Sequence, residues 1–342
     1  MAPHPSEIVA AARALEQGSL VAFPTETVYG LGADAENPVA IARIYAAKGR
    51  PSNHPIIVHV APDADLGYWV SALPDAARLL IDAFWPGPLT LILPRAAHIP
   101  AAVSGGQDSI GIRCPSHPVA RALLRAFRNG KGGIAAPSAN KFGHVSPTTA
   151  HHVEDEFSGE IGPGGAIANV LDGGPSAVGI ESTIVDLSRF GERGAVLLRP
   201  GQISLAQLTD VLGRAPAMPD ASAPRASGTL AAHYAPRTPV TLVASGSLHS
   251  VLVGLAATQR RVALLHWRPL VVEPGDGVVA LRLPATPAGY ARALYAGLRT
   301  LDAIGAALIV IEAVPDALPW EAINDRLQRA VFDSSGVLER LL

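Results

Sequence analysis

The feature that most constrains the fold is the alternation of short apolar runs with stretches of helical periodicity. Up to about residue 204, each apolar run is only a few residues long and ends at Gly, Pro or polar residues. This pattern predicts an α/β domain. Its order is not a regular βαβ repeat, so we expect a twisted mixed sheet. The expected strands are residues 20–23, 56–60, 89–93, 109–113, 134–136 and 183–187, and the expected helices are residues 7–17, 38–47, 75–84 and 118–127.

The last hundred or so residues alternate more regularly. This pattern predicts a smaller open parallel sheet with helices on both faces. No G-x-G-x-x-G motif follows its first strand, so the sequence gives no support for dinucleotide binding. The expected strands are residues 240–244, 262–266, 278–283 and 307–311, and the expected helices are residues 247–257, 287–301 and 320–331.

Residues 205–238 differ from both flanking regions. A short helix is expected at residues 205–212, but residues 215–227 are rich in Ala, Pro and Ser and have no apolar period. Such a composition predicts an ordered, partly extended linker. It ends in His233-Tyr234-Ala235-Pro236. Bulky and rigid side chains of this kind indicate that the linker has a function beyond connecting the two domains.

Composition excludes several classes of protein. Of the 342 residues 49% are hydrophobic and 16% are charged, so the chain can bury a large core. A net charge of −2 excludes a globally basic nucleic-acid coat, though a local basic patch stays open. The single cysteine cannot form an internal disulfide or, alone, a zinc site. No signal peptide is evident, and the longest uncharged run, residues 238–259, reads better as strand, turn and helix than as a membrane span. We therefore expect a soluble cytoplasmic protein without a membrane partner.

Two cations flank a glycine at the end of an expected helix, in Lys48-Gly49-Arg50-Pro51-Ser52. Cations at a helix C-terminus can simply stabilise the helix dipole. However, such a cap needs one cation, and Arg50 lies beyond the glycine. Two cations with a hydroxyl two residues later favour a phosphate-binding site.

The polar residues after the first strand allow two interpretations. Thr25, Glu26 and Thr27 precede glycines that would permit a ligand to approach the backbone. Alternatively, these hydroxyls only satisfy the backbone of a turn. His59, taken alone, is more typical of a satisfied core residue. Arg113 ends a strand on the same side as Ser109 and Gly111, where it needs a carboxylate or phosphate partner.

Further polar residues follow later strands. Ser138 and Asn140 close one strand, Glu181 and Ser182 precede another, and Arg199 lies in a third. No Ser-His-Asp order, Cys-His pair, metal-ligand spacing or Walker motif accompanies them. The residues alone therefore indicate a concave anion site that binds two ligands by positioning and electrostatics, not a covalent catalyst.

Six motifs follow one another along the first domain. They are Phe23-Pro24-Thr25-Glu26-Thr27-Val28-Tyr29-Gly30-Leu31-Gly32, Lys48-x-Arg50-Pro51, Trp85-Pro86-Gly87-Pro88, Ser138-x-Asn140, Glu181-Ser182-Thr183 and Leu198-Arg199-Pro200-Gly201. In this order they resemble the Sua5/YrdC/YciO family, and the His233-Tyr234-Ala235-Pro236 signature and the second domain resemble its long Sua5 form. The resemblance implies a YrdC-like catalytic domain at residues 1–204, a linker or lid at 205–238 and a Rossmann-like Sua5 C-terminal domain at 239–342.

This resemblance implies an L-threonylcarbamoyladenylate synthase. Such enzymes combine L-threonine, bicarbonate or CO₂, and ATP into threonylcarbamoyl-AMP and pyrophosphate. The product serves threonylcarbamoyladenosine modification of tRNAs that read ANN codons, through a separate transferase complex. Mg²⁺, held mainly through the ATP phosphates, is the implied cofactor, and no tightly bound organic cofactor is expected.

The resemblance also implies roles for individual residues. Lys48 and Arg50 are the expected catalytic residues, which stabilise charge on the phosphates. The expected ATP-binding residues are Lys48, Arg50, Ser52, Ser109, Ser138, Asn140, Ser146, Arg199 and His233. The expected threonine-binding residues are Thr25, His59, Arg113, Ala136 and Ser182.

Two other functions stay open from sequence. The first is a tRNA- or double-stranded-RNA-binding module without catalysis, because related proteins of this fold have a concave basic face. The second is a carbamoyl-transfer domain, but the cysteines and acylphosphatase module that usually accompany it are missing from this sequence. Weak binding of tRNA or double-stranded RNA is also compatible with the enzyme.

Overall fold

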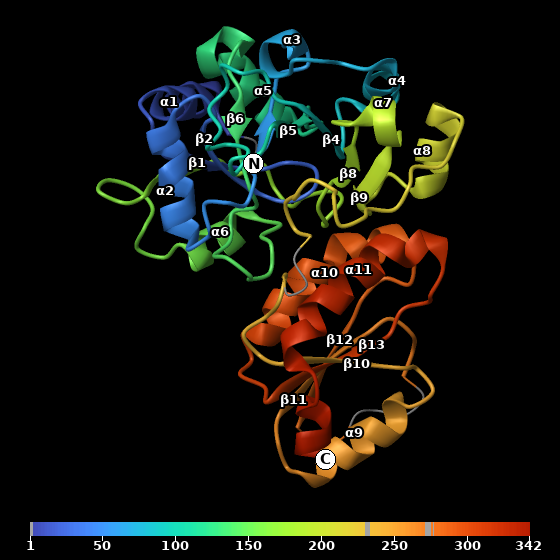
Figure 1. Ribbon diagram of the computed structural model, residues 1–342. Helices are drawn as coiled ribbons and strands as arrows, with labels where there is room; N and C mark the ends of the chain where they lie inside the picture. Colours follow the sequence, from blue (N-terminus) through green and yellow to red (C-terminus); the bar gives the residue numbers. More distant parts are fainter. Residues whose placement is uncertain (1–2, 230–232, 271–274, 276) are drawn as a thin grey trace. The chain divides into compact units, whose positions relative to one another are not determined.

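The computed structural model describes residues 3–229, 233–270, 275 and 277–342. The chain divides into two compact units, one of residues 1–142 and 146–229 and the other of residues 143–145 and 230–342. Each unit has its own sheet and its own helices (Figure 1). Of the linker predicted at residues 205–238, residues 205–229 belong to the first unit, and residues 230–232 lie outside the described residues.

The described residues of the first unit form a nine-stranded sheet in the order β7-β1-β2-β6-β3-β5-β4-β8-β9. The pairs β1–β7, β3–β5 and β4–β8 are parallel and the other neighbours are antiparallel. The prediction of a mixed sheet is therefore confirmed. The strands are β1 (Leu20–Phe23), β2 (Gly30–Asp34), β3 (Ile57–His59), β4 (Leu89–Pro94), β5 (Ser109–Arg113), β6 (Ile134–Ala135), β7 (Ile167–Val170), β8 (Thr183–Asp186) and β9 (Val196–Arg199).

The two faces of this sheet have different covers. Helices α2, α4, α6 and α8 contribute to the main core on one face, and α1 and α5 pack on the other face with Val21 and Phe23. Ile57, Ile92 and Ile184 belong to a separate apolar cluster. The helices are α1 (Pro5–Glu16), α2 (Pro38–Lys48), α3 (Leu66–Trp69), α4 (Asp75–Phe84), α5 (Pro118–Ala126), α6 (Ala150–Glu156), α7 (Phe190–Arg193) and α8 (Leu205–Leu212).

Strand β2 was not predicted, because its sequence Gly-Leu-Gly-Ala-Asp reads as a turn. The glycines instead allow neighbouring strands to pack closely. A Cβ on Gly32 would lie 2.8 Å from both Ile134 Cγ2 and Phe23 Cε1. Strand β7 was missed as well, because it lies in a Gly-rich region.

The described residues of the second unit form a four-stranded sheet in the order β10-β13-β11-β12, and all its strands are parallel. The predicted Rossmann-like parallel sheet is therefore confirmed. Its elements are β10 (Val240–Val243), α9 (Leu248–Ala257), β11 (Val262–His266), β12 (Val278–Arg282), α10 (Pro287–Asp302), β13 (Leu308–Glu312), α11 (Glu321–Val331) and α12 (Val337–Leu341).

Helices cover both faces of the second sheet, as expected. Leu248 and Leu255 of α9 pack against Val262, Leu264 and Val310 on one face. On the other face a Cβ at Gly297 of α10 would lie 3.2 Å from Leu265 Cδ1. Figure 1 shows α10 and α11 together on the face opposite α9.

Candidate functional site

Lys48 is the last residue of α2, and its ammonium contacts the loop after β6. Asn37 caps the start of the helix with a side chain that accepts two backbone hydrogen bonds, and Gly49, with φ of +63°, caps its end. Lys48 Nζ donates to the carbonyl oxygen of Ser138 at 2.6 Å and to that of Asn140. The lysine thus binds a distant loop instead of capping its own helix, and it brings two of the predicted motifs together.

The environment of Lys48 favours an anionic ligand. Its side chain is buried, and burial together with the charge of Arg50 lowers the pKa of Lys48 well below its usual value. A neighbouring anion would stabilise the ammonium form and offset both effects. Phosphate oxygens are anions of the required kind.

Ser227 contacts two of the predicted phosphate-binding arginines. Arg50 Nη2 donates to Ser227 Oγ at 3.3 Å and to the Pro55 carbonyl at 2.8 Å. Arg199 Nη1 donates to the Ser227 carbonyl at 2.7 Å, and its other nitrogens donate to Ser182. Both arginines are buried. The sequence predicted the arginines but not Ser227, which lies in the Ala-, Pro- and Ser-rich segment.

Arg113 is held by a network of buried acceptors. Its Nη2 donates to Glu26 Oε1 at 2.6 Å, its Nη1 donates to Thr27 Oγ1 at 2.9 Å, and its Nε donates to the Gly87 carbonyl at 3.3 Å. Arg113 and Glu26 are both nearly inaccessible to solvent. The acidic partner expected for Arg113 is therefore present within the chain. Glu26 was not among the predicted site residues.

The hydroxyl of Thr25 forms its hydrogen bonds within its own turn. Its Oγ1 donates to the Val28 carbonyl at 2.6 Å and accepts bonds from the backbone N–H groups of Thr27 and Val28. The interpretation of this hydroxyl as a backbone partner therefore holds. A contact between Thr25 and a ligand would have to come from its backbone.

His59 lies beside Arg113, because the two residues are partners in the parallel pairing of β3 and β5. Its ring packs edge-on against Phe23 with 6.0 Å between the ring centres. Its Nδ1 is buried and has no hydrogen-bond partner among the described residues. Burial, followed by the charge of Arg113, lowers the pKa of His59 to about 3. The imidazole is therefore neutral at physiological pH.

We expect the buried His59 to make the protein less stable in acid. The unfolded chain binds a proton at His59 near pH 6.5, whereas the folded chain binds it only near pH 3. The free energy of unfolding should therefore fall as the pH decreases between these values, by at most about 1.4 kcal/mol per pH unit from this group. Denaturant titrations of the His59→Gln variant between pH 7 and about pH 4 should show a shallower fall than the parent chain. Equal slopes would contradict the assignment.

Ser182 connects Arg199 with strand β4. Its Oγ lies 2.8 Å from Thr90 Oγ1 on β4 and accepts a bond from Arg199 Nη2 at 3.1 Å. Ala136 follows β6, and its N–H donates to the Ile57 carbonyl at 2.9 Å, so a ligand contact there would use its carbonyl group. Thr90 was not predicted as a site residue.

The remaining predicted residues lie on other elements. Ser109 begins β5, about 13 Å along the strand from Arg113, since four residues separate them. Ser146 Oγ donates to Glu181 Oε1 at 2.6 Å. Ser52 is exposed in the turn after α2. His233 belongs to the second unit.

The neighbouring Cys114 does not suit nucleophilic catalysis. It is buried, and burial raises the pKa of its thiol to about 11. A thiol with that pKa is protonated at neutral pH. The arrangement of cations, hydroxyls and a neutral histidine instead suits charge stabilisation on bound ligands.

Two family models match this chain. Residues 13–201 match the family model of Sua5, YciO and YrdC, described as "Telomere recombination". Residues 203–331 match a second model, described as "Threonylcarbamoyl-AMP synthase, C-terminal domain".

Similar proteins span nearly the whole chain. The threonylcarbamoyl-AMP synthase of Pyrococcus abyssi is 37% identical, with 94% of this chain and 92% of that protein covered. The threonylcarbamoyl-AMP synthase of Bacillus subtilis is 38% identical, with 95% and 92% covered. The crystal structure of P. abyssi Sua5 complexed with L-threonine has a TM-score of 0.85 and 34% identity, with 97% of this chain and 96% of that chain covered.

Proposed function

The chain belongs to the Sua5/YrdC/YciO family, in its two-domain Sua5 form, and on that premise we propose that it is a threonylcarbamoyl-AMP synthase. It combines L-threonine, bicarbonate or CO₂, and ATP into threonylcarbamoyl-AMP and pyrophosphate. The observation that supports the proposal most directly is that buried Lys48 donates to the carbonyls of Ser138 and Asn140. These bonds hold a cation in place for an anionic ligand, and the proposed reaction needs no protein nucleophile.

At the nucleotide end, Lys48, Arg50 and Arg199 bind the ATP phosphates. Ser52, Ser138, Asn140 and Ser146 complete the phosphate and ribose contacts, and Ser109 lies near the adenosine. Two observations support this assignment. All three cations are buried, and Arg50 and Arg199 both donate hydrogen bonds to Ser227. Buried cations bind phosphate more strongly than exposed ones, because water does not screen them.

At the amino-acid end, Arg113 binds the threonine carboxylate as a fork. Among the described residues, Thr27, Glu26 and Gly87 engage three of its five N–H groups, which leaves two for a carboxylate. The unpartnered Nδ1 of His59 accepts a hydrogen bond from threonine, with further contacts from the backbone of Thr25 and Ala136 and from Ser182.

The reaction proceeds without a covalent enzyme intermediate. The amine of threonine adds to CO₂ and loses a proton, which gives a carbamate. A carbamate oxygen attacks the α-phosphorus in line, its bond to phosphorus forms, and the bond to the pyrophosphate oxygen breaks. Lys48 and Arg50 stabilise the charge that grows on the phosphoryl oxygens. Positioning of the two ligands supplies the rest of the rate increase.

We propose that Mg²⁺ enters with ATP and is held mainly through the phosphates. Within the described ranges, no three His, Cys, Asp or Glu side chains come together as a metal site. The acidic groups Glu26 and Glu181 are instead bonded to Arg113 and Ser146. When bound, Mg²⁺ would neutralise charge on the phosphates and assist the departure of pyrophosphate.

The product would serve the threonylcarbamoyladenosine modification of tRNAs that read ANN codons, through a separate transferase complex. We place this work in the cytoplasm, where tRNA is modified, and include weak binding of tRNA. Of the helices that the structure describes, none is long and apolar enough to cross a membrane.

Mass spectrometry of the product tests the proposal. The protein, ATP, Mg²⁺, L-threonine and ¹³C-bicarbonate should yield threonylcarbamoyl-AMP that carries the label. A binding module without catalysis, which the names of the relatives do not favour, would give no labelled adenylate. It would bind RNA with an affinity that falls steeply with salt.

We expect the His233→Ala variant to form the product about tenfold more slowly, the effect of one lost hydrogen bond to the nucleotide. The comparison is with His151→Ala, which removes an exposed histidine of α6. Initial rates at an ATP concentration well below the KM of the parent chain, with saturating threonine, measure the effect. Equal rates for the two variants would contradict a lid role for the His233-Tyr234-Ala235-Pro236 segment.

A further inference from the structure

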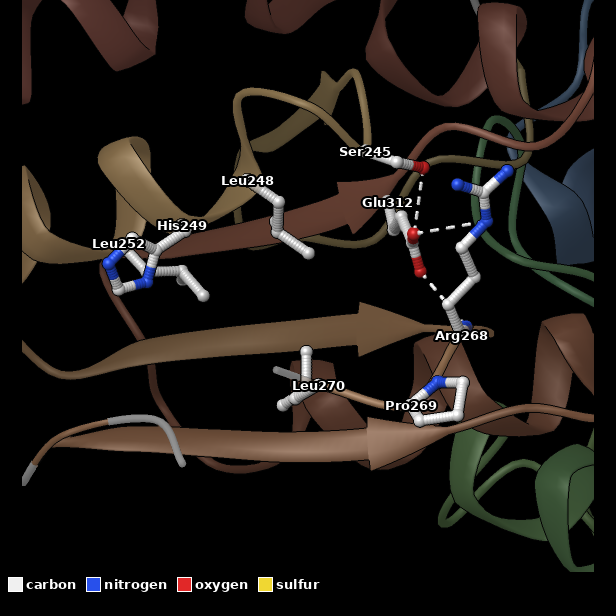
Figure 2. A pocket seen from close by; sticks show the side chains of 8 residues that line it. All are labelled: Ser245, Leu248, His249, Leu252, Arg268, Pro269, Leu270 and Glu312. Atoms are coloured by element: carbon white, nitrogen blue, oxygen red, sulfur yellow. Dashed lines mark hydrogen bonds and ion pairs between the residues drawn. The ribbon is translucent and has the colours of Figure 1, made fainter. Parts of the chain in front are cut away.

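The second unit contains a pocket of about 170 Å³ that the proposed reaction does not use (Figure 2). It lies where β10, β11 and β13 end, and the first turns of α9 form one wall. In open parallel sheets, ligands bind at the carboxyl ends of the strands. The lining residues are Ser245, Leu248, His249, Leu252, Arg268, Pro269, Leu270 and Glu312.

The charged residues of this pocket and Ser245 lie at one end, and His249 lies beside Leu252 at the other. Figure 2 shows Ser245, Glu312 and Arg268 gathered at one end, with the leucine side chains away from them along the pocket. Leu248 of α9 is buried, and Leu252 and Leu270 are half-buried. A ligand that fits this surface has a charged head and a hydrocarbon tail.

Glu312 is fixed before any ligand binds. Its Oε2 accepts backbone N–H bonds from Trp267 at 3.0 Å and Arg268 at 3.1 Å, and its Oε1 accepts a bond from Ser245 Oγ at 2.7 Å. The carboxylate is only 3% exposed. Because each carboxylate oxygen can accept two bonds, Oε1 retains a place for one further donor. An ammonium group is a donor that also compensates the buried negative charge.

Arg268 supplies the opposite charge at the same end. Its Nε lies 3.9 Å from Glu312 Oε1, and its guanidinium stacks on Trp267 at 4.6 Å from the ring centre. The side chain is 55% exposed, and no hydrogen bond from its Nη atoms is found among the described residues. These terminal nitrogens can therefore bind a carboxylate in the bidentate geometry that arginine favours.

We propose that this pocket binds a free aliphatic α-amino acid of about the size of leucine. The ammonium group contacts Glu312, the carboxylate contacts Arg268, and the side chain lies against the leucines. A simple anion would be repelled by Glu312 and a simple cation by Arg268, so a zwitterion satisfies both. The volume is close to that of an engineered cavity of about 150 Å³ that holds benzene, which is enough for a branched four-carbon side chain.

Calorimetric titration of the full chain with L-leucine tests this assignment. Saturating L-threonine is present so that the proposed catalytic pocket is occupied. The control ligands are 4-methylpentanoate, which lacks the amine, and 3-methylbutylamine, which lacks the carboxylate. We expect L-leucine to bind and each control ligand to bind at least tenfold more weakly.

Two variants test whether leucine binds in this pocket. Arg268→Gln removes an exposed guanidinium, and Leu252→Phe fills the apolar end; each should weaken leucine binding at least tenfold. Arg260→Gln removes another exposed arginine of this unit and should leave binding unchanged. The Lys48→Ala variant should still bind leucine, so failure of the proposed catalytic function would not remove this result.

Three outcomes would overturn the proposal. No binding of leucine, isoleucine, valine or methionine at millimolar concentration would show that the pocket takes no such ligand. Binding that is unchanged in both Arg268→Gln and Leu252→Phe would place the ligand elsewhere. Binding of 4-methylpentanoate as tight as that of leucine would show a carboxylate site without a role for Glu312.

Discussion

Replacement of Lys48 by alanine is expected to lower the rate of threonine-dependent pyrophosphate release about 100- to 1,000-fold, the usual cost of losing one preorganised donor. Its Nζ bonds to the carbonyls of Ser138 and Asn140 and lies buried beside Arg50. A charge in such a site is worth more to a developing anion than one in water. The loss should appear mainly in kcat.

Lys131→Ala is the matched control, because Lys131 is an exposed lysine of the same unit. Its activity should equal that of the parent chain. Thermal unfolding of both variants shows whether the loss arises from misfolding. A Lys48→Ala variant that is folded and retains more than about a tenth of the activity would contradict the assigned role.

Replacement of Arg113 by glutamine is expected to raise the KM for threonine about 100-fold. The change removes a forked contact to the proposed carboxylate, and charge-assisted pairs of this kind are among the stronger hydrogen bonds. It also leaves Glu26 as a buried charge without its partner, which typically costs about 3–5 kcal/mol of the free energy of unfolding. Steady-state kinetics and denaturant unfolding measure the two effects separately.

A double variant separates binding from stability. Glu26→Gln combined with Arg113→Gln removes both charges, so part of the stability should return while the KM stays high. Arg125→Gln, which removes a half-exposed arginine of α5, should change neither quantity. A normal KM in the folded double variant would contradict the threonine-binding role of Arg113.

Much of the fold could be predicted, because apolar runs of strand length mark most strands of both sheets. The runs at residues 109–113 and 262–266 coincide with β5 and β11. Strand β2 could not be predicted this way, because Gly30 and Gly32 have low strand propensity. Gly30 instead packs against Phe23 and Ala136, and Gly32 packs against Phe23 of β1 and Ile134 of β6.

The candidate site was predictable where a positively charged residue stood at the end of a helix or strand. Lys48, Arg113 and Arg199 are examples, and the structure gives each of them buried polar partners. Ser227 gave no such signal, because one serine in an Ala-, Pro- and Ser-rich segment is unremarkable in sequence. Its importance comes from tertiary contacts with Arg50 and Arg199.

Release of pyrophosphate from ATP, Mg²⁺ and bicarbonate, with and without L-threonine, tests the central claim most directly. The account predicts release that requires threonine and is lost in the Lys48→Ala variant. Release that is independent of threonine, or no release with any amino acid together with salt-sensitive RNA binding, would contradict it.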